Sequence, residues 1–141
     1  DDPEYIEQLD KIKLPFLPTG KHRAFPIKGD SMLPVKDGSF IVGRYIEDLQ
    51  DIKNGTTYVL LTKDDGMVYK RVFDQLKLKG SLLLVSDNKE YQPYDVSASD
   101  ILEVWEFTCA IQTQEYNADE LKISSILQMF NNIGAELSTL R

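Results

Sequence analysis

The chain has 141 residues and a formal net charge of −7, with 42% hydrophobic and 28% charged residues. This composition is typical of one globular domain that is large enough to bury a core. Surfaces that bind nucleic acid are usually basic, so the acidic balance argues against direct DNA binding by this segment. Cys109 is the single cysteine, which excludes an intrachain disulfide, and one cysteine with one histidine makes a zinc site improbable.

Two further classes are disfavoured by the sequence. No apolar run is long enough to cross a bilayer, and no signal-peptide pattern opens the chain. Together with the single cysteine, this favours a cytoplasmic protein. The sequence begins with Asp1 rather than methionine, so we expect further sequence upstream.

The first segment, residues 1–22, reads as a lead-in to the domain. Asp2 followed by Pro3 predicts the start of a short helix. Pro15 and Pro18 break any helix after that, so the second half of the segment is expected to be a linker.

Residues 23–114 predict a mostly β domain of twisted antiparallel sheets and hairpins. The stretch "SFIVGRYI" is rich in β-branched and aromatic residues, and "DILEVWEFTCAIQ" reads as a long closing strand. Two hairpins are expected, one with "TYVLLTK" and "MVYKRVF" around Asp64-Asp65-Gly66, the other with "QLKLK" and "SLLLVS" around Gly80. Strands do not alternate with helices, so a parallel sheet is not expected.

Residues 115–141 change to a helical period and predict a C-terminal amphipathic helix. Asn117, followed three residues later by Glu120, is an acceptable helix start. The apolar residues are spaced by three and four, in a heptad-like seam: Ile123, Ile126, Phe130, Ile133, Leu137 and Leu140. Two interpretations stay open, because the seam is short for an autonomous coiled coil: it packs on its own domain, or it pairs with another chain.

The stretch "IKGDSMLP" places Ser31 in a turn between Gly29 and Pro34. A serine hydroxyl is a poor nucleophile unless a neighbouring base takes its proton. In the predicted strand "MVYKRVF", side chains alternate between faces, so Lys70 shares a face with two valines. A lysine there either reaches out to water or stays buried, where desolvation favours the neutral amine. A neutral amine beside a serine is a competent general base.

Each half of this pair also has an ordinary structural interpretation, as a turn serine and a solvated strand lysine. His22 is a rival base, although its Lys-His-Arg run looks like a solvated loop. Asp30 is more typical of a turn-forming acceptor than of an acid catalyst. Asp64 and Asp65 are more typical of a hairpin tip than of a catalytic carboxylate pair.

Three segments, "GDSMLPVKDGSFIV", "NGTTYVLLTKDDGMVYKRV" and "LLLVSDNKEYQPYDV", together resemble the C-terminal peptidase domain of LexA and of lambda-type phage repressors. The resemblance covers residues 25–108 and implies a β-clip type fold with a Ser–Lys dyad. It assigns Ser31 as the nucleophile and Lys70 as the general base, with the backbone N–H groups of Ser31 and Met32 as the oxyanion hole. It implies no cofactor and no metal.

The resemblance also implies partners. Members of this family cleave their own linker before the domain, usually at Ala-Gly or Cys-Gly, and in many of them a RecA filament promotes the cut during the SOS response. Cleavage separates a DNA-binding domain from its dimerising half. We therefore expect a homodimer with its own N-terminal linker as substrate, a RecA filament as activator, and DNA contact only through an upstream domain.

The sequence departs from the family pattern in three places. No Ala-Gly or Cys-Gly pair occurs in the 141 residues, Ser39 stands where many relatives carry an acidic residue, and the heptad-like tail is extra. Three hypotheses follow: a self-cleaving domain of a transcriptional regulator, a non-catalytic dimerisation or sensing module, and a UmuD-like subunit of a translesion polymerase. For the second, the dimer surface is expected on the tail or near the closing strand around Trp105. A signal peptidase, which also uses serine and lysine, is disfavoured because no membrane anchor is present.

Overall fold

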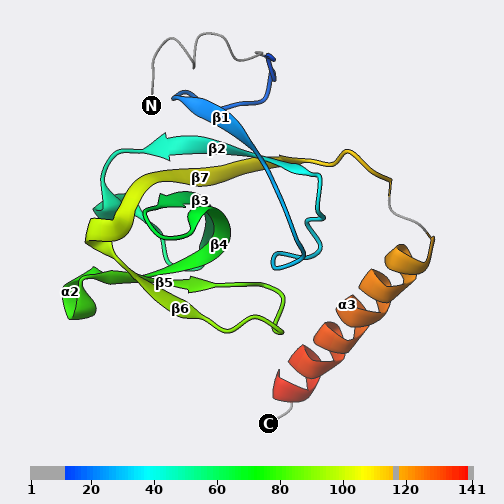
Figure 1. Ribbon diagram of the computed structural model, residues 1–141. Helices are drawn as coiled ribbons and strands as arrows, with labels where there is room; N and C mark the ends of the chain where they lie inside the picture. The colour runs from blue at the N-terminus through cyan, green and yellow to red at the C-terminus, as the bar shows by residue number, and fades with distance from the viewer. Residues whose placement is uncertain (1–11, 116–117, 140–141) are drawn as a thin grey trace.

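The structure is a computed structural model that describes residues 12–115 and 118–139 (Figure 1). Seven strands form one antiparallel sheet in the order β1-β2-β7-β3-β4-β5-β6. This confirms the predicted mostly β fold, with one sheet in place of several. The strands are β1 (His22–Pro26), β2 (Phe40–Ile46), β3 (Thr56–Thr62), β4 (Gly66–Gln75), β5 (Ser81–Val85), β6 (Tyr94–Ser97) and β7 (Ile101–Ile111).

Two α-helices and two short 3-10 turns complete the described chain. They are α2 (Leu76–Lys79), α3 (Ala118–Thr139) and the 3-10 turns Leu49–Asp51 and Ala98–Asp100. In the part of the chain that the structure describes, none of the helices has the length and apolar character that crossing a membrane requires. The helix predicted to start at Asp2 and Pro3 falls outside the described residues.

The connection between β4 and β5 differs from the sequence prediction. The hairpin around Gly66 is confirmed, but only Gln75 of "QLKLK" lies in a strand, because residues 76–79 form the single turn of α2. Asp74 accepts a hydrogen bond from the Leu76 N–H at the start of this turn. Gly80 ends it in the left-handed conformation, with its N–H donating to the Leu76 carbonyl. Leucine and lysine favour helix over strand, which local alternation had concealed.

The sheet carries apolar side chains on both faces. Along β3, Tyr58 and Leu60 belong to one buried cluster, whereas Val59 between them belongs to another. Trp105 of β7 lies in the second cluster, with the rings of Phe25 and Tyr45 meeting it edge-on at centroid distances of 5.3 and 5.2 Å. Trp105 itself is buried against its own chain, so a dimer surface near this closing strand would use other side chains, and that surface stays a prediction.

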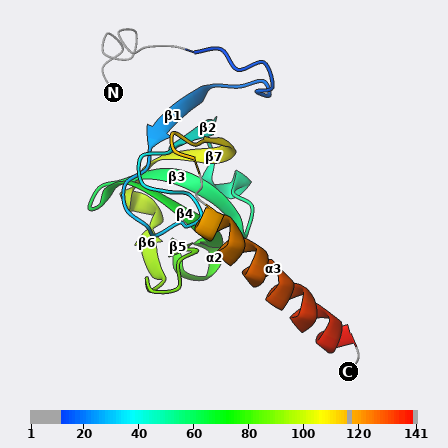
Figure 2. The ribbon, with the colours of Figure 1, turned by 90° about the vertical axis from the view of Figure 1, so that its right-hand side faces the viewer.

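Helix α3 stands away from the sheet. Both Figure 1 and Figure 2 show it projecting from the β body after the end of β7. The predicted helix is confirmed, but packing of its seam on its own domain is not seen among the described residues: Ile123, Ile126, Phe130 and Ile133 are all at least 51% exposed. Asn117 and Leu140, predicted at the two ends of the helix, lie outside the described residues.

This arrangement predicts that the sheet is stable without α3. Deleting residues 116–141 should leave the urea midpoint of unfolding unchanged at low protein concentration, because the apolar side chains that the structure describes on α3 are exposed and not packed on the sheet. Tryptophan fluorescence measures the transition, since Trp105 reports on the core. A midpoint that falls markedly in the truncated protein would contradict the separation of α3 from the sheet.

Candidate active site

Ser31 lies in the long loop between β1 and β2, where a network of backbone bonds fixes its turn. At the base of the loop, the Ile27 N–H donates to the Ser39 carbonyl and the Gly38 N–H donates to the Ile27 carbonyl, at 2.8 and 2.9 Å. The Val35 N–H donates to the Met32 carbonyl at 2.9 Å. Met32 is buried in the core beneath the turn, so its neighbour Ser31 is held at a half-buried position.

Lys70 reaches this serine from β4. Its Nζ lies 2.9 Å from Ser31 Oγ and 2.9 Å from Ser86 Oγ. The lysine is 9% exposed and Ser86 is 3% exposed, so the amine sits between two hydroxyls with little access to water. Val72 on the same face of β4 is fully buried, as the strand alternation predicted.

Burial lowers the pKa of the Lys70 amine below its ordinary value. An ordinary lysine is neutral in only about 4 molecules in 10,000 at pH 7, so lowering the pKa directly increases the fraction that can act as a base. The Tyr91 ring, 5.7 Å from Nζ, favours the ammonium and opposes this effect. Once neutral, the amine can accept the Ser31 proton while still donating an N–H to Ser86.

The segment from Ser86 to Tyr91, hereafter the 86–91 segment, is hydrogen-bonded to the serine turn. The Asn88 N–H donates to the Ser31 carbonyl at 2.9 Å, and Asn88 Nδ2 donates to the Asp30 carbonyl at 3.0 Å. The Asp87 N–H donates to Met32 Sδ at 3.3 Å. Ser31 and Lys70 are therefore both tied to the same short stretch of chain.

Arg71, the neighbour of Lys70 on β4, anchors the 86–91 segment to the sheet. Its Nε and one terminal nitrogen each donate to a carboxylate oxygen of Asp87 at 2.8 Å, and its other nitrogen donates to the Gly55 carbonyl. The guanidinium holds the pKa of the Asp87 carboxyl below its ordinary value. This two-pronged pair fixes the position of the residues that follow it.

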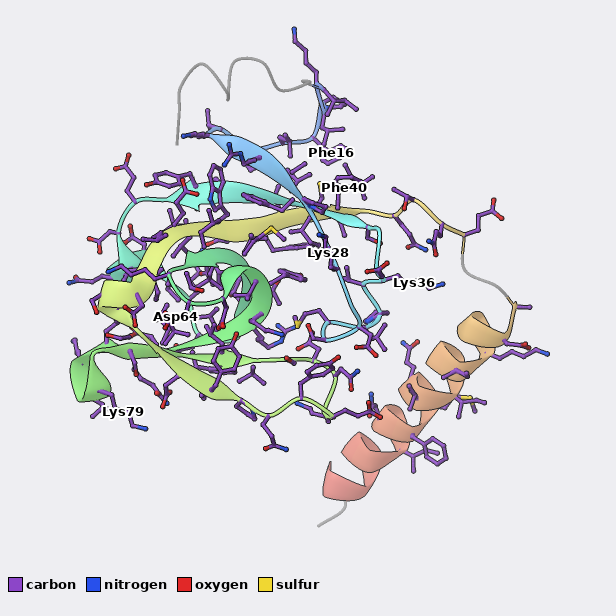
Figure 3. All side chains as sticks on the ribbon, in the orientation of Figure 1. Phe16, Lys28, Lys36, Phe40, Asp64 and Lys79 are labelled. Carbon is purple, nitrogen blue, oxygen red and sulfur yellow. The ribbon has the colours of Figure 1, made fainter. Side chains whose placement is uncertain are left out.

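The remaining candidate residues do not contact the Lys70 amine among the described hydrogen bonds. His22 lies in β1 rather than in a solvated loop, so that expectation is wrong; its Nδ1 is 3.0 Å from the Gly20 carbonyl. It lines an open hollow of about 720 Å³ formed with residues of the lead-in. Asp30 accepts a hydrogen bond from the Tyr91 hydroxyl. In Figure 3, Asp64 lies at the opposite end of the sheet from Lys28 and Lys36, which belong to the serine loop.

The part of the site that the sequence reading missed is the second hydroxyl and its neighbours. Strands β4 and β5 pair in a register that ends at Arg71 opposite Val85, and this brings the next residue, Ser86, beside Lys70. The signal was present in "SDNKEYQP", which was recognised only as part of the resemblance. Across residues 12–115 and 118–139, no three His, Cys, Asp or Glu side chains gather where they could hold a metal ion.

The burial of Lys70 predicts a specific pH dependence of stability. Burial disfavours the charged amine, so the folded state is less stable at pH values where Lys70 is protonated. This cost decreases as the pH rises above the folded pKa, and it is absent above the unfolded pKa of about 10.4. The free energy of unfolding of the wild type, minus that of Lys70→Met, should therefore grow between pH 7 and pH 10. Urea titrations at each pH measure it.

Taking this difference cancels the ionisation of tyrosines, which both proteins share. Lys28→Met is the matched control, because Lys28 is an exposed lysine of the serine loop, and it should show no such trend. A difference between wild type and Lys70→Met that stays constant with pH would show that the amine is not desolvated.

One of the comparisons with known proteins finds a family for this chain. The family model described as Peptidase S24-like matches residues 2–106, which include the serine turn, β4 and the 86–91 segment. A search of curated proteins finds no match. The resemblance to the LexA and UmuD type of Ser–Lys peptidases is thereby confirmed, and the chain belongs to the Peptidase S24-like family.

Proposed function

We propose that this chain is the self-cleaving peptidase domain of a LexA-like or phage-type transcriptional regulator, with Ser31 as nucleophile and Lys70 as general base. One observation carries the proposal: the amine of a buried lysine lies 2.9 Å from the hydroxyl of a serine held in a fixed turn. Few structural roles would require a lysine to be desolvated against two hydroxyls.

The proposed reaction begins with neutral Lys70. The amine takes the Ser31 proton as Oγ attacks the carbonyl carbon of the substrate peptide, and the negative charge on the carbonyl oxygen is accepted by the backbone N–H groups of Ser31 and Met32. The C–N bond then breaks, and the Lys70 ammonium returns its proton to the leaving amine. Water hydrolyses the resulting ester with Lys70 again as base, which restores the serine.

The substrate in this proposal is the protein's own N-terminal linker. No Ala-Gly or Cys-Gly pair occurs in these 141 residues, so a substrate bond of that type lies outside them. A RecA filament as activator, a homodimer, DNA contact through an upstream domain and action in the cytoplasm complete the proposal for a regulator of the LexA type.

Self-cleavage should accelerate with pH. The protein with its native upstream residues, incubated between pH 7 and pH 10, should yield two fragments, faster at higher pH as more Lys70 becomes neutral. Ser31→Ala and Lys70→Ala should each slow the cut by at least about 100-fold, measured by gel densitometry and mass spectrometry. Lys28→Ala, in the same loop, should cleave like the wild type. Cleavage by Lys70→Ala at the wild-type rate would rule out the dyad.

A second candidate, a non-catalytic dimerisation or sensing module, is favoured by the exposed apolar seam of α3. Four apolar residues spaced by three and four residues along one helix are at least half exposed to solvent. Apolar faces of this kind are commonly covered by a second chain.

Under this second candidate, deleting residues 116–141 should convert a dimer into a monomer. Multi-angle light scattering measures the mass of the full chain and of the truncated one at the same concentration. A dimer that survives the deletion would place the contact on the sheet and leave α3 without a role in it.

A UmuD-like polymerase subunit is the third candidate. Its discriminating feature is the sequence before residue 1: a helix-turn-helix domain favours the regulator, whereas a short arm favours the polymerase subunit.

A further inference from the structure

Asn88 holds two successive backbone carbonyls of the serine turn. Its side-chain Nδ2 donates to the Asp30 carbonyl at 3.0 Å, and its backbone N–H donates to the Ser31 carbonyl at 2.9 Å. Both carbonyls therefore point toward the same residue, on the 86–91 segment side of the turn.

The direction of these carbonyls fixes the direction of two amide groups. In a trans peptide the C=O and the N–H point in opposite directions. Among the described residues, the single cis peptide is Leu33-Pro34, so the peptides 30–31 and 31–32 are trans. The N–H groups of Ser31 and Met32 must then both point away from Asn88. Within residues 12–115 and 118–139, the hydrogen bonds of the turn leave these two N–H groups without a protein acceptor.

Two neighbouring backbone N–H groups that point the same way form a small site for negative charge. In acyl transfer, such donors stabilise the oxyanion only if they are already oriented before the reaction. We propose that Asn88 is the positioning residue of the oxyanion hole, which it builds by holding the carbonyls of Asp30 and Ser31. This inference rests on the proposed function, since it assigns the hole to that same reaction.

Both polar atoms of the Asn88 side chain are hydrogen-bonded, which fixes its orientation as a positioning residue requires. Its Oδ1 accepts the Glu90 N–H at 3.1 Å, and its carbonyl accepts the Tyr91 N–H at 3.2 Å. Two residues earlier, Ser86 contacts the Lys70 amine. One short segment thus sets both halves of the machinery: Ser86 acts on the base and Asn88 on the charge acceptor.

The test measures the rate of Ser31 labelling as a function of pH, because a change at the base moves the pH of half-maximal rate whereas a change at the oxyanion hole lowers the plateau. The probe is a fluorophosphonate, on which Ser31 Oγ forms a bond to phosphorus as fluoride leaves, with negative charge developing on the phosphoryl oxygen. Asn88→Ala should lower the plateau rate of Ser31 labelling by about 10- to 100-fold. The pH of half-maximal rate should stay where it is in the wild type, because Lys70 keeps its surroundings.

A plateau that is unchanged in Asn88→Ala, or an inflection that moves with the rate, would overturn the inference. Lys89→Ala is the matched control, because Lys89 is the exposed neighbour of Asn88 in the same segment, and it should label like the wild type.

A second measurement decides the inference without any activity. Asn88→Leu keeps the size and the backbone N–H and adds no charge, and it removes the side-chain donor to the Asp30 carbonyl together with the acceptor of the Glu90 N–H. In ¹⁵N–¹H spectra, the Ser31 and Met32 amide signals should shift while those of β3 and β7 stay in place, which also shows that the variant is folded. Unchanged Ser31 and Met32 signals would refute the role of Asn88. If wild-type Ser31 is labelled at no pH, the proposed function fails, and the spectra still decide the role of Asn88.

Discussion

The candidate site of this domain is organised around one lysine that is kept out of water. Lys70 is buried on β4, and its amine contacts the hydroxyls of Ser31 and Ser86. Burying an amine is costly unless it has partners or loses its charge. A serine hydroxyl can accept a hydrogen bond from the ammonium and can donate one to the neutral amine. A carboxylate beside the amine would instead favour the charged ammonium. These partners are therefore compatible with the neutral amine that the proposed reaction requires.

The 86–91 segment connects two parts of the site that are far apart in the sequence, strand β4 and the turn of Ser31. Arg71 pairs with Asp87, which places Asn88 against the serine turn. Exposed ion pairs contribute little to stability, but a two-pronged guanidinium–carboxylate pair fixes geometry well. This pair matters here for position, because Asn88 is hydrogen-bonded to the backbone of Asp30 and Ser31.

Strand periodicity was enough to predict the face of β4 that carries Lys70, and turn residues were enough to predict the loop of Ser31. Ser86 and Asn88 could not be assigned roles in this way, since their contacts depend on the register between β4 and β5 and on the path of the chain after β5. The helical turn at residues 76–79 was missed for a related reason: four residues of alternating leucine and lysine fit either period, and the Gly80 backbone decides between them.

The position of β1 has a kinetic consequence. This edge strand leads directly into the loop of Ser31, so any segment just before β1 is covalently tethered to Ser31, the proposed nucleophile, by a short stretch of chain. A tethered substrate meets the serine at an effective concentration set by the linker and not by the amount of protein. A cut made in that segment would follow first-order kinetics and would be insensitive to dilution, so a cell holding few copies would respond as fast as one holding many.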